Sequence, residues 1–86
     1  MLTKTEKDIL SAEGAVAFLE EGLRKIQVDL EYYVTQINLN NSPKLAGAYS
    51  LSAEKLRRDQ FTVTRLLGEA RNKLQDAKLR HMYRVA

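Results

Sequence analysis

The chain of 86 residues contains no cysteine and no tryptophan, and its single proline, Pro43, lies at the midpoint. Without cysteine, disulfide bonds and thiolate metal sites are excluded. With only one proline, the segments on either side of Pro43 can each form a long helix without a proline break. A protein built from a few long helices is therefore the first expectation.

Long apolar runs are also absent. The longest stretch without a charged residue, residues 32–43, is too short and too polar to cross a bilayer. The charged segment 1–8 is not followed by the apolar run that a secretory signal needs. We therefore expect a cytoplasmic protein with no membrane insertion. Export by a leaderless route would leave no mark in the sequence, so it stays open.

Charge is divided unevenly along the chain. Its formal net charge of +3 combines a net charge of −3 over residues 1–40 with one of +6 over residues 41–86. A basic half of this kind can indicate nucleic-acid binding. In a hairpin, however, the acidic and basic halves would lie side by side and neutralise each other.

Apolar side chains recur at seven-residue spacing in both halves of the chain. Such a repeat is typical of helices that pack along one seam. In the first half, the rows are Leu2, Ile9, Val16, Leu23, Leu30 and Ile37, and Thr5, Ala12, Leu19, Ile26 and Tyr33. In the second half, they are Ala53, Gln60, Leu67, Leu74 and His81, and Tyr49, Leu56, Val63, Ala70 and Ala77. Folding the chain at Pro43 gives every layer a partner, for example Leu19 opposite Leu67.

These rows predict an all-α fold: one long antiparallel two-helix hairpin, similar to a coiled coil, in a single domain spanning residues 1–86. We expect helix one over about 3–38, a turn over about 39–43 and helix two over about 43–83. Thr3 with Glu6 fits a capping box, and Ser42 followed by Pro43 fits the start of a second helix. A parallel self-dimer of either helix is the competing interpretation, because a heptad seam alone does not determine orientation.

Flanking charges support the antiparallel register. The fold-back predicts Glu6 opposite Lys78, Glu13 opposite Arg71 and Gln27 opposite Arg57, with Asp8 near Arg80. It also brings Asp29 near Asp59, which is repulsive. Gly14 and Gly22 lie inside helix one at a cost of roughly 1 kcal/mol each relative to Ala, so we expect them to serve close packing.

No residue carries a catalytic signature. His81 is the only histidine, and we expect it to pack or cap the open end of the hairpin, because no nucleophile or orienting partner accompanies it. Gln60 falls on the seam, where a polar residue can set register. We expect no enzymatic activity, no metal, no cofactor and no small-molecule substrate.

Apolar residues remain after the seam is filled. A two-helix hairpin has only one seam, so these residues are available for self-association into a four-helix bundle or for a partner's helix. Isolated surface apolar residues are also common and need no function. The predicted partner-binding residues are Phe18, Gly22, Tyr32, Leu39, Phe61 and Leu66.

The basic residues of helix two allow a second hypothesis. Arg58 and Arg65 are seven apart and point outward in the predicted hairpin, so they could contact a nucleic-acid backbone. No aromatic–basic recognition motif accompanies them. We therefore expect a helical adaptor, assembly chaperone or structural subunit, with nucleic-acid binding through helix two as the alternative.

The turn Asn41-Ser42-Pro43, followed by Tyr49, Leu56, Val63 and Leu67, resembles the plan of the two-helix needle co-chaperones of type III secretion. That resemblance implies a hairpin that holds secretion components before assembly. The small secreted hairpins of type VII secretion carry a Trp-x-Gly turn. Here the nearest counterpart is Leu45-Ala46-Gly47, which lacks the Trp and follows the expected fold-back. Both resemblances concern architecture, and neither identifies a family.

Overall fold

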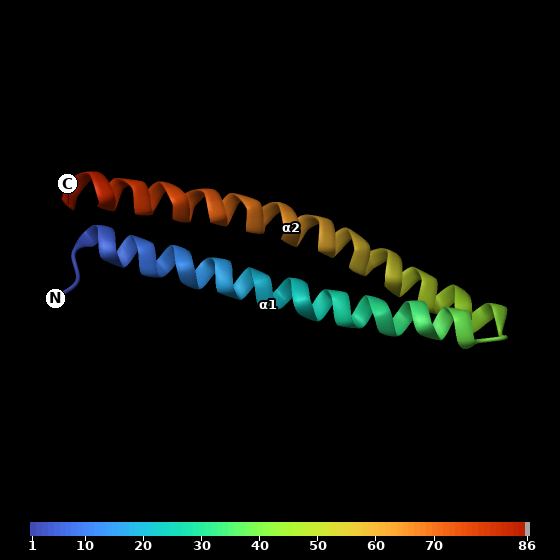
Figure 1. Cartoon of the computed structure of the whole chain (residues 1–86). Helices are drawn as coiled ribbons and strands as arrows, with labels where there is room; N and C mark the ends of the chain where they lie inside the picture. Colours follow the sequence, from blue (N-terminus) through green and yellow to red (C-terminus); the bar gives the residue numbers. More distant parts are fainter. Residues whose placement is uncertain (86) are drawn as a thin grey trace.

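A computed structural model describes residues 1–85 of the chain, with the side chains of residues 1–83. Two helices, α1 (Lys4–Leu39) and α2 (Pro43–Val85), account for nearly all of these residues. They run antiparallel and side by side, so that both chain ends lie at the same end of the molecule (Figure 1). An all-α, two-helix architecture is confirmed, and the helix bounds lie within two residues of the expected ones.

Local capping explains where the helices begin. The Oγ1 atom of Thr3 accepts a hydrogen bond from the backbone N–H of Glu6 at 3.2 Å, which satisfies one of the free donors at the start of α1. In the turn, Asn40 Oδ1 accepts from the N–H of Ser42 at 3.0 Å. Pro43 then takes the first position of α2, where its missing N–H has no cost.

The seam between the helices contains the expected rows. The buried side chains of the described region are Ala53, Leu67 and Ala77, all members of the predicted seam. The other members are half-buried, except Leu2, which is exposed. Leu2 was wrongly placed in the seam, because α1 begins only at Lys4. The ring of Tyr33 lies 6.0 Å from that of Tyr49, so the two helices also contact each other close to the turn.

The hairpin is long and thin. Its Cα atoms span 64 × 20 × 14 Å, and their radius of gyration is 19.1 Å, against about 12 Å for a compact domain of this length. Its accessible surface is 6674 Å², against about 5,200 Å² for a compact monomer of 9.8 kDa. None of the residues of α1 is fully buried. One seam therefore leaves much of the apolar surface in water.

Over the described residues, neither helix has an apolar stretch long enough to span a membrane.

A Cβ atom added at Gly14 or Gly22 would meet no atom of the other helix within 4 Å. The expected close packing at these glycines is therefore absent within the hairpin, and they leave open space on its surface.

Candidate interaction surface

The apolar side chains predicted to bind a partner are largely exposed. Phe18 retains 78% of its accessible surface and Phe61 retains 74%, whereas Leu66 retains 38%. Tyr32 and Leu39 are also exposed, and Gly22 is half-exposed. An exposed Phe on each of two helices is more than the scattered small apolar groups that any surface carries.

Most of these residues share one side of the hairpin, which we call the Phe18 face. Two surface hollows locate it: Asp8 and Arg80 line one, and Asp29 and Asp59 line the other. Residues seven apart lie on one side of a helix. The inner rows beside the seam are therefore Asp8, Ala15, Gly22 and Asp29 in α1, and Asp59, Leu66, Lys73 and Arg80 in α2. The outer row of α1 is Lys4, Ser11, Phe18, Lys25, Tyr32 and Leu39.

Phe61 lies on the opposite side, the Phe61 face. A third hollow, lined by residues that include Leu30, Val34 and Arg57, marks this side. Phe61 follows Arg57 by one helical turn, whereas the five residues from Phe61 to Leu66 turn the helix by about 140°. The fold thus brings Phe18, Gly22 and Leu66 together, with Tyr32 and Leu39 further along the same row, and separates Phe61 from all of them.

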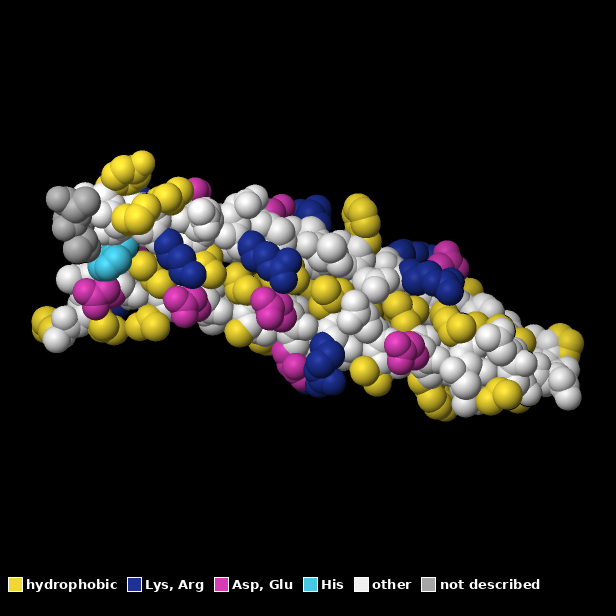
Figure 2. All heavy atoms as spheres, in the orientation of Figure 1, with side chains coloured by type: hydrophobic (Ala, Val, Ile, Leu, Met, Phe, Trp, Pro, Cys, Tyr) yellow, Lys and Arg dark blue, Asp and Glu magenta, His cyan; other side chains and the backbone are white. Residues whose placement is uncertain are grey.

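Charges bridge the two helices at one point among the described side chains. Arg71 of α2 lies 3.6 Å from Glu20 of α1, on the face where basic side chains of α2 lie beside acidic side chains of α1 (Figure 2). The expected partner of Arg71 was Glu13, so this prediction is wrong by one heptad. An Arg side chain is long enough to reach either carboxylate.

The other expected cross-helix pairs do not form within 4.0 Å among the described side chains. Instead, ion pairs form within single helices: Glu21–Arg24, Glu54–Arg58 and Arg65–Glu69. The hydrogen bond from the Arg24 guanidinium lowers the pKa of the Glu21 carboxyl below its usual value. Because these pairs are exposed to solvent, each contributes little to the stability of its helix.

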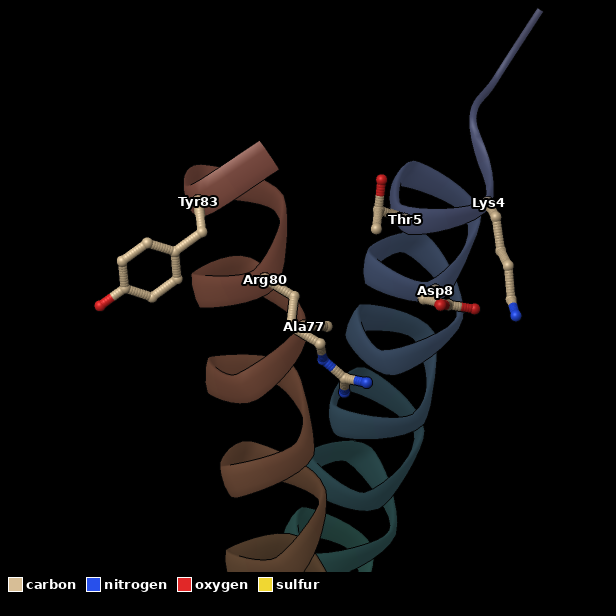
Figure 3. A pocket seen from close by; sticks show the side chains of 6 residues that line it. All are labelled: Lys4, Thr5, Asp8, Ala77, Arg80 and Tyr83. Atoms are coloured by element: carbon tan, nitrogen blue, oxygen red, sulfur yellow. The ribbon is translucent and has the colours of Figure 1, made fainter. Parts of the chain in front are cut away.

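The open end of the hairpin has a hollow of about 360 Å³, lined by Lys4, Thr5, Asp8, Ala77, Arg80 and Tyr83. The Arg80 guanidinium reaches across toward α1, whereas the Tyr83 ring points away from it (Figure 3). Nearby, the Nδ1 atom of His81 is buried without a hydrogen-bond partner among the described residues. The described region contains no cluster of three His, Asp or Glu side chains that could hold a metal ion.

No protein-family model matches this chain, and no curated protein or solved structure matches it either.

Proposed function

We propose that this chain is a non-enzymatic helical protein–protein interaction module that acts as an adaptor, assembly chaperone or structural subunit. It would work by burying the Phe18 face against helices of a second molecule. The observation that carries this proposal is the exposed aromatic side chain of Phe18 beside Gly22 and Leu66, on a hairpin whose own seam fully buries few side chains.

Burial of this face is favourable in free energy. Covering an apolar side chain of the size of Phe or Leu stabilises by about 1.5–3 kcal/mol. Aromatic side chains at the centre of an interface commonly dominate its binding energy. Gly22, which has no side chain, leaves room beside Phe18 for an incoming helix. The plan shared with two-helix secretion co-chaperones agrees with such a role but adds no residue-level support.

The rival hypothesis, nucleic-acid binding through α2, has weaker support. Arg58 and Arg65 each form an ion pair with a glutamate of α2, so part of their charge is already neutralised. This rival predicts an affinity that falls steeply with salt and with the removal of both arginines.

A double substitution tests the proposal. Phe18→Asp with Leu66→Asp should abolish association, measured by light scattering of the purified protein and by recovery of a partner from native extract. Helicity measured by circular dichroism should be largely retained, because both side chains lie outside the seam. Leu51→Asp is the matched control, since Leu51 is 70% exposed and lies outside the Phe18 face. Association equal to that of the wild type in the double variant would show that this surface is not the binding site.

A further inference from the structure

We propose that the occupant of the Phe18 face is a second copy of this chain, docked antiparallel to form a four-helix bundle with a two-fold axis between Ala15 and Phe18. This inference rests on the proposed function, because it names the partner of the same face. It is carried by the charge complementarity of α1, with which one pair of α2 is compatible.

The first step concerns α1. In an antiparallel two-fold pair, the outer row of one copy faces the inner row of the other. When Phe18 is set opposite Ala15 of the second copy, Lys25 falls opposite Asp8 and Lys4 falls opposite Asp29. Symmetry repeats each contact, so four opposite-charge pairs flank a centre in which a large aromatic ring meets a small side chain. This is the pattern of a well-filled helix interface.

Neighbouring registers lack this match. Shifting the second copy by seven residues in either direction removes every opposite-charge pair: each charged side chain of α1 then faces an uncharged residue or, for Asp29 in one register, none. In one of these registers, Phe18 would face Asp8. Within the hairpin, as far as its side chains are described, none of the four groups forms an ion pair within 4.0 Å. They are therefore available to pair with a second molecule.

The second step concerns α2. On the Phe18 face, Glu69 and Lys73 occupy the outer and inner rows of this helix. A two-fold axis level with residue 71 relates two antiparallel copies of α2 and sets Glu69 of each copy opposite Lys73 of the other. One carboxylate oxygen of Glu69 already accepts a hydrogen bond from Arg65 at 3.0 Å, and the other oxygen is left for the lysine.

The third step joins the two helices. Asp8 shares a hollow with Arg80, and Asp29 shares another with Asp59, so the part of α1 around residue 17 lies beside the part of α2 around residue 71. The charges of α1 place the axis between residues 16 and 17, and a Glu69–Lys73 pair between copies corresponds to an axis at residue 71. One axis therefore accommodates the pairs of both helices. The charges of α2 alone would also allow a register shifted by seven residues, with Glu69 opposite Arg80 and Asp76 opposite Lys73, so the charges of α1 determine the position of the axis.

Geometry and area agree with this arrangement. The rows of the Phe18 face are turned by about 100° from the seam, which is close to the right angle between the two contacts of each helix in a four-helix bundle. A standard interface removes about 800 Å² from each partner, which is about half of the hairpin's excess over a compact monomer.

The mass of the 86-residue chain in solution is the first test. We expect a dimer in the wild type and a monomer in the Phe18→Asp variant. Leu51→Asp is the matched control, because Leu51 is 70% exposed and lies outside the Phe18 face. A dimer in Phe18→Asp, or a monomer in Leu51→Asp, would overturn the proposal.

Charge reversal gives a second readout that does not depend on Phe18. Asp8→Lys or Lys25→Asp alone should weaken the dimer by about tenfold, and the double variant should recover most of that loss. Helicity measured by circular dichroism shows whether each variant still folds. Additive weakening in the double variant would contradict an Asp8–Lys25 pair between copies.

Spin labels test the orientation directly. Two separate variants, Gly14→Cys and Thr35→Cys, each carry one label, because the chain has no other cysteine. In an antiparallel dimer the axial distance between labels grows by about 3 Å per residue away from the axis, so the Thr35 pair should lie about 48 Å further apart along the helices than the Gly14 pair. Equal distances would indicate a parallel dimer and would overturn the proposal.

The two levels of inference fail separately. A wild type that remains monomeric at about 100 μM, a concentration at which even micromolar affinity would give a dimer, would overturn the second-copy inference. If that monomer bound a purified helical partner and lost it on Phe18→Asp, the proposed function would survive. A monomer with no Phe18-dependent partner would overturn both.

Discussion

At the scale of single residues, His81 shows how one polar side chain can lower the stability of the packing between the two helices. The sequence places it on a seam row near the open end, and the structure finds its Nδ1 atom buried without a hydrogen-bond partner among the described residues. A buried polar atom without a partner costs about 1–3 kcal/mol of stability. An apolar side chain of similar size at this position would not carry that cost.

Replacing His81 by Leu should therefore raise the melting temperature of the hairpin. For a domain of this size, 1 kcal/mol corresponds to about 4–8 °C. Thermal unfolding followed by circular dichroism measures the change. Gln75→Leu is the control, because Gln75 is exposed and its replacement removes no buried polar atom. A lower melting temperature for His81→Leu would show that the histidine has a partner that stabilises the native state.

Each helix, as an element, depends on the residue before it. Thr3 caps α1 through its side chain. Asn40 orders the turn that precedes α2, and α2 begins at Pro43. The sequence was sufficient to predict both starts, because capping depends on residues that are close together in the chain. It also predicted the seam, since the seven-residue repeat of apolar side chains is a local pattern.

Other features could not be predicted from local pattern. Arg71 pairs with Glu20 rather than Glu13 because a long side chain can reach either of two carboxylates, and only the packed geometry selects one. Helical periodicity could assign Phe18 and Phe61 to different sides of the hairpin. How far each of these side chains is exposed depends on the packed hairpin, because periodicity alone does not say how much of it the other helix covers.

Replacing Thr3 by Ala should destabilise α1 by about 1 kcal/mol, because the N–H of Glu6 would lose its acceptor. Urea unfolding followed by circular dichroism would report the loss as a lower midpoint at unchanged slope. Ser11→Ala provides the comparison, since Ser11 is exposed within the helix and caps nothing. An equal effect of the two substitutions would argue against a specific cap at Thr3.

The whole molecule is a rod with one fold-back, and its length equals that of its longer helix. Both chain ends lie at the open end of the hairpin, where Asp8 and Arg80 line one hollow (Figures 1 and 3). Few side chains lie far from water, so stability has to come from a long, shallow seam rather than from a central core.

Spin labels at Lys7→Cys and Lys78→Cys in one chain test this shape. Packed helices lie 8–10 Å apart, so the two labels should be within about 25 Å of each other. Dilution with unlabelled chain removes distances between copies. A second labelled chain, with Lys7→Cys and Thr35→Cys, provides a ruler of about 42 Å along α1. If the labels at Lys7 and Lys78 were further apart than this reference distance, the two halves of the chain would not fold back on each other.

The neighbouring positions of the two chain ends have a practical consequence (Figure 1). A host protein could receive the whole hairpin in a surface loop, because the polypeptide would enter and leave the insert at nearly the same point. The hairpin would then project from its host as an arm about as long as α2, with the turn at the tip.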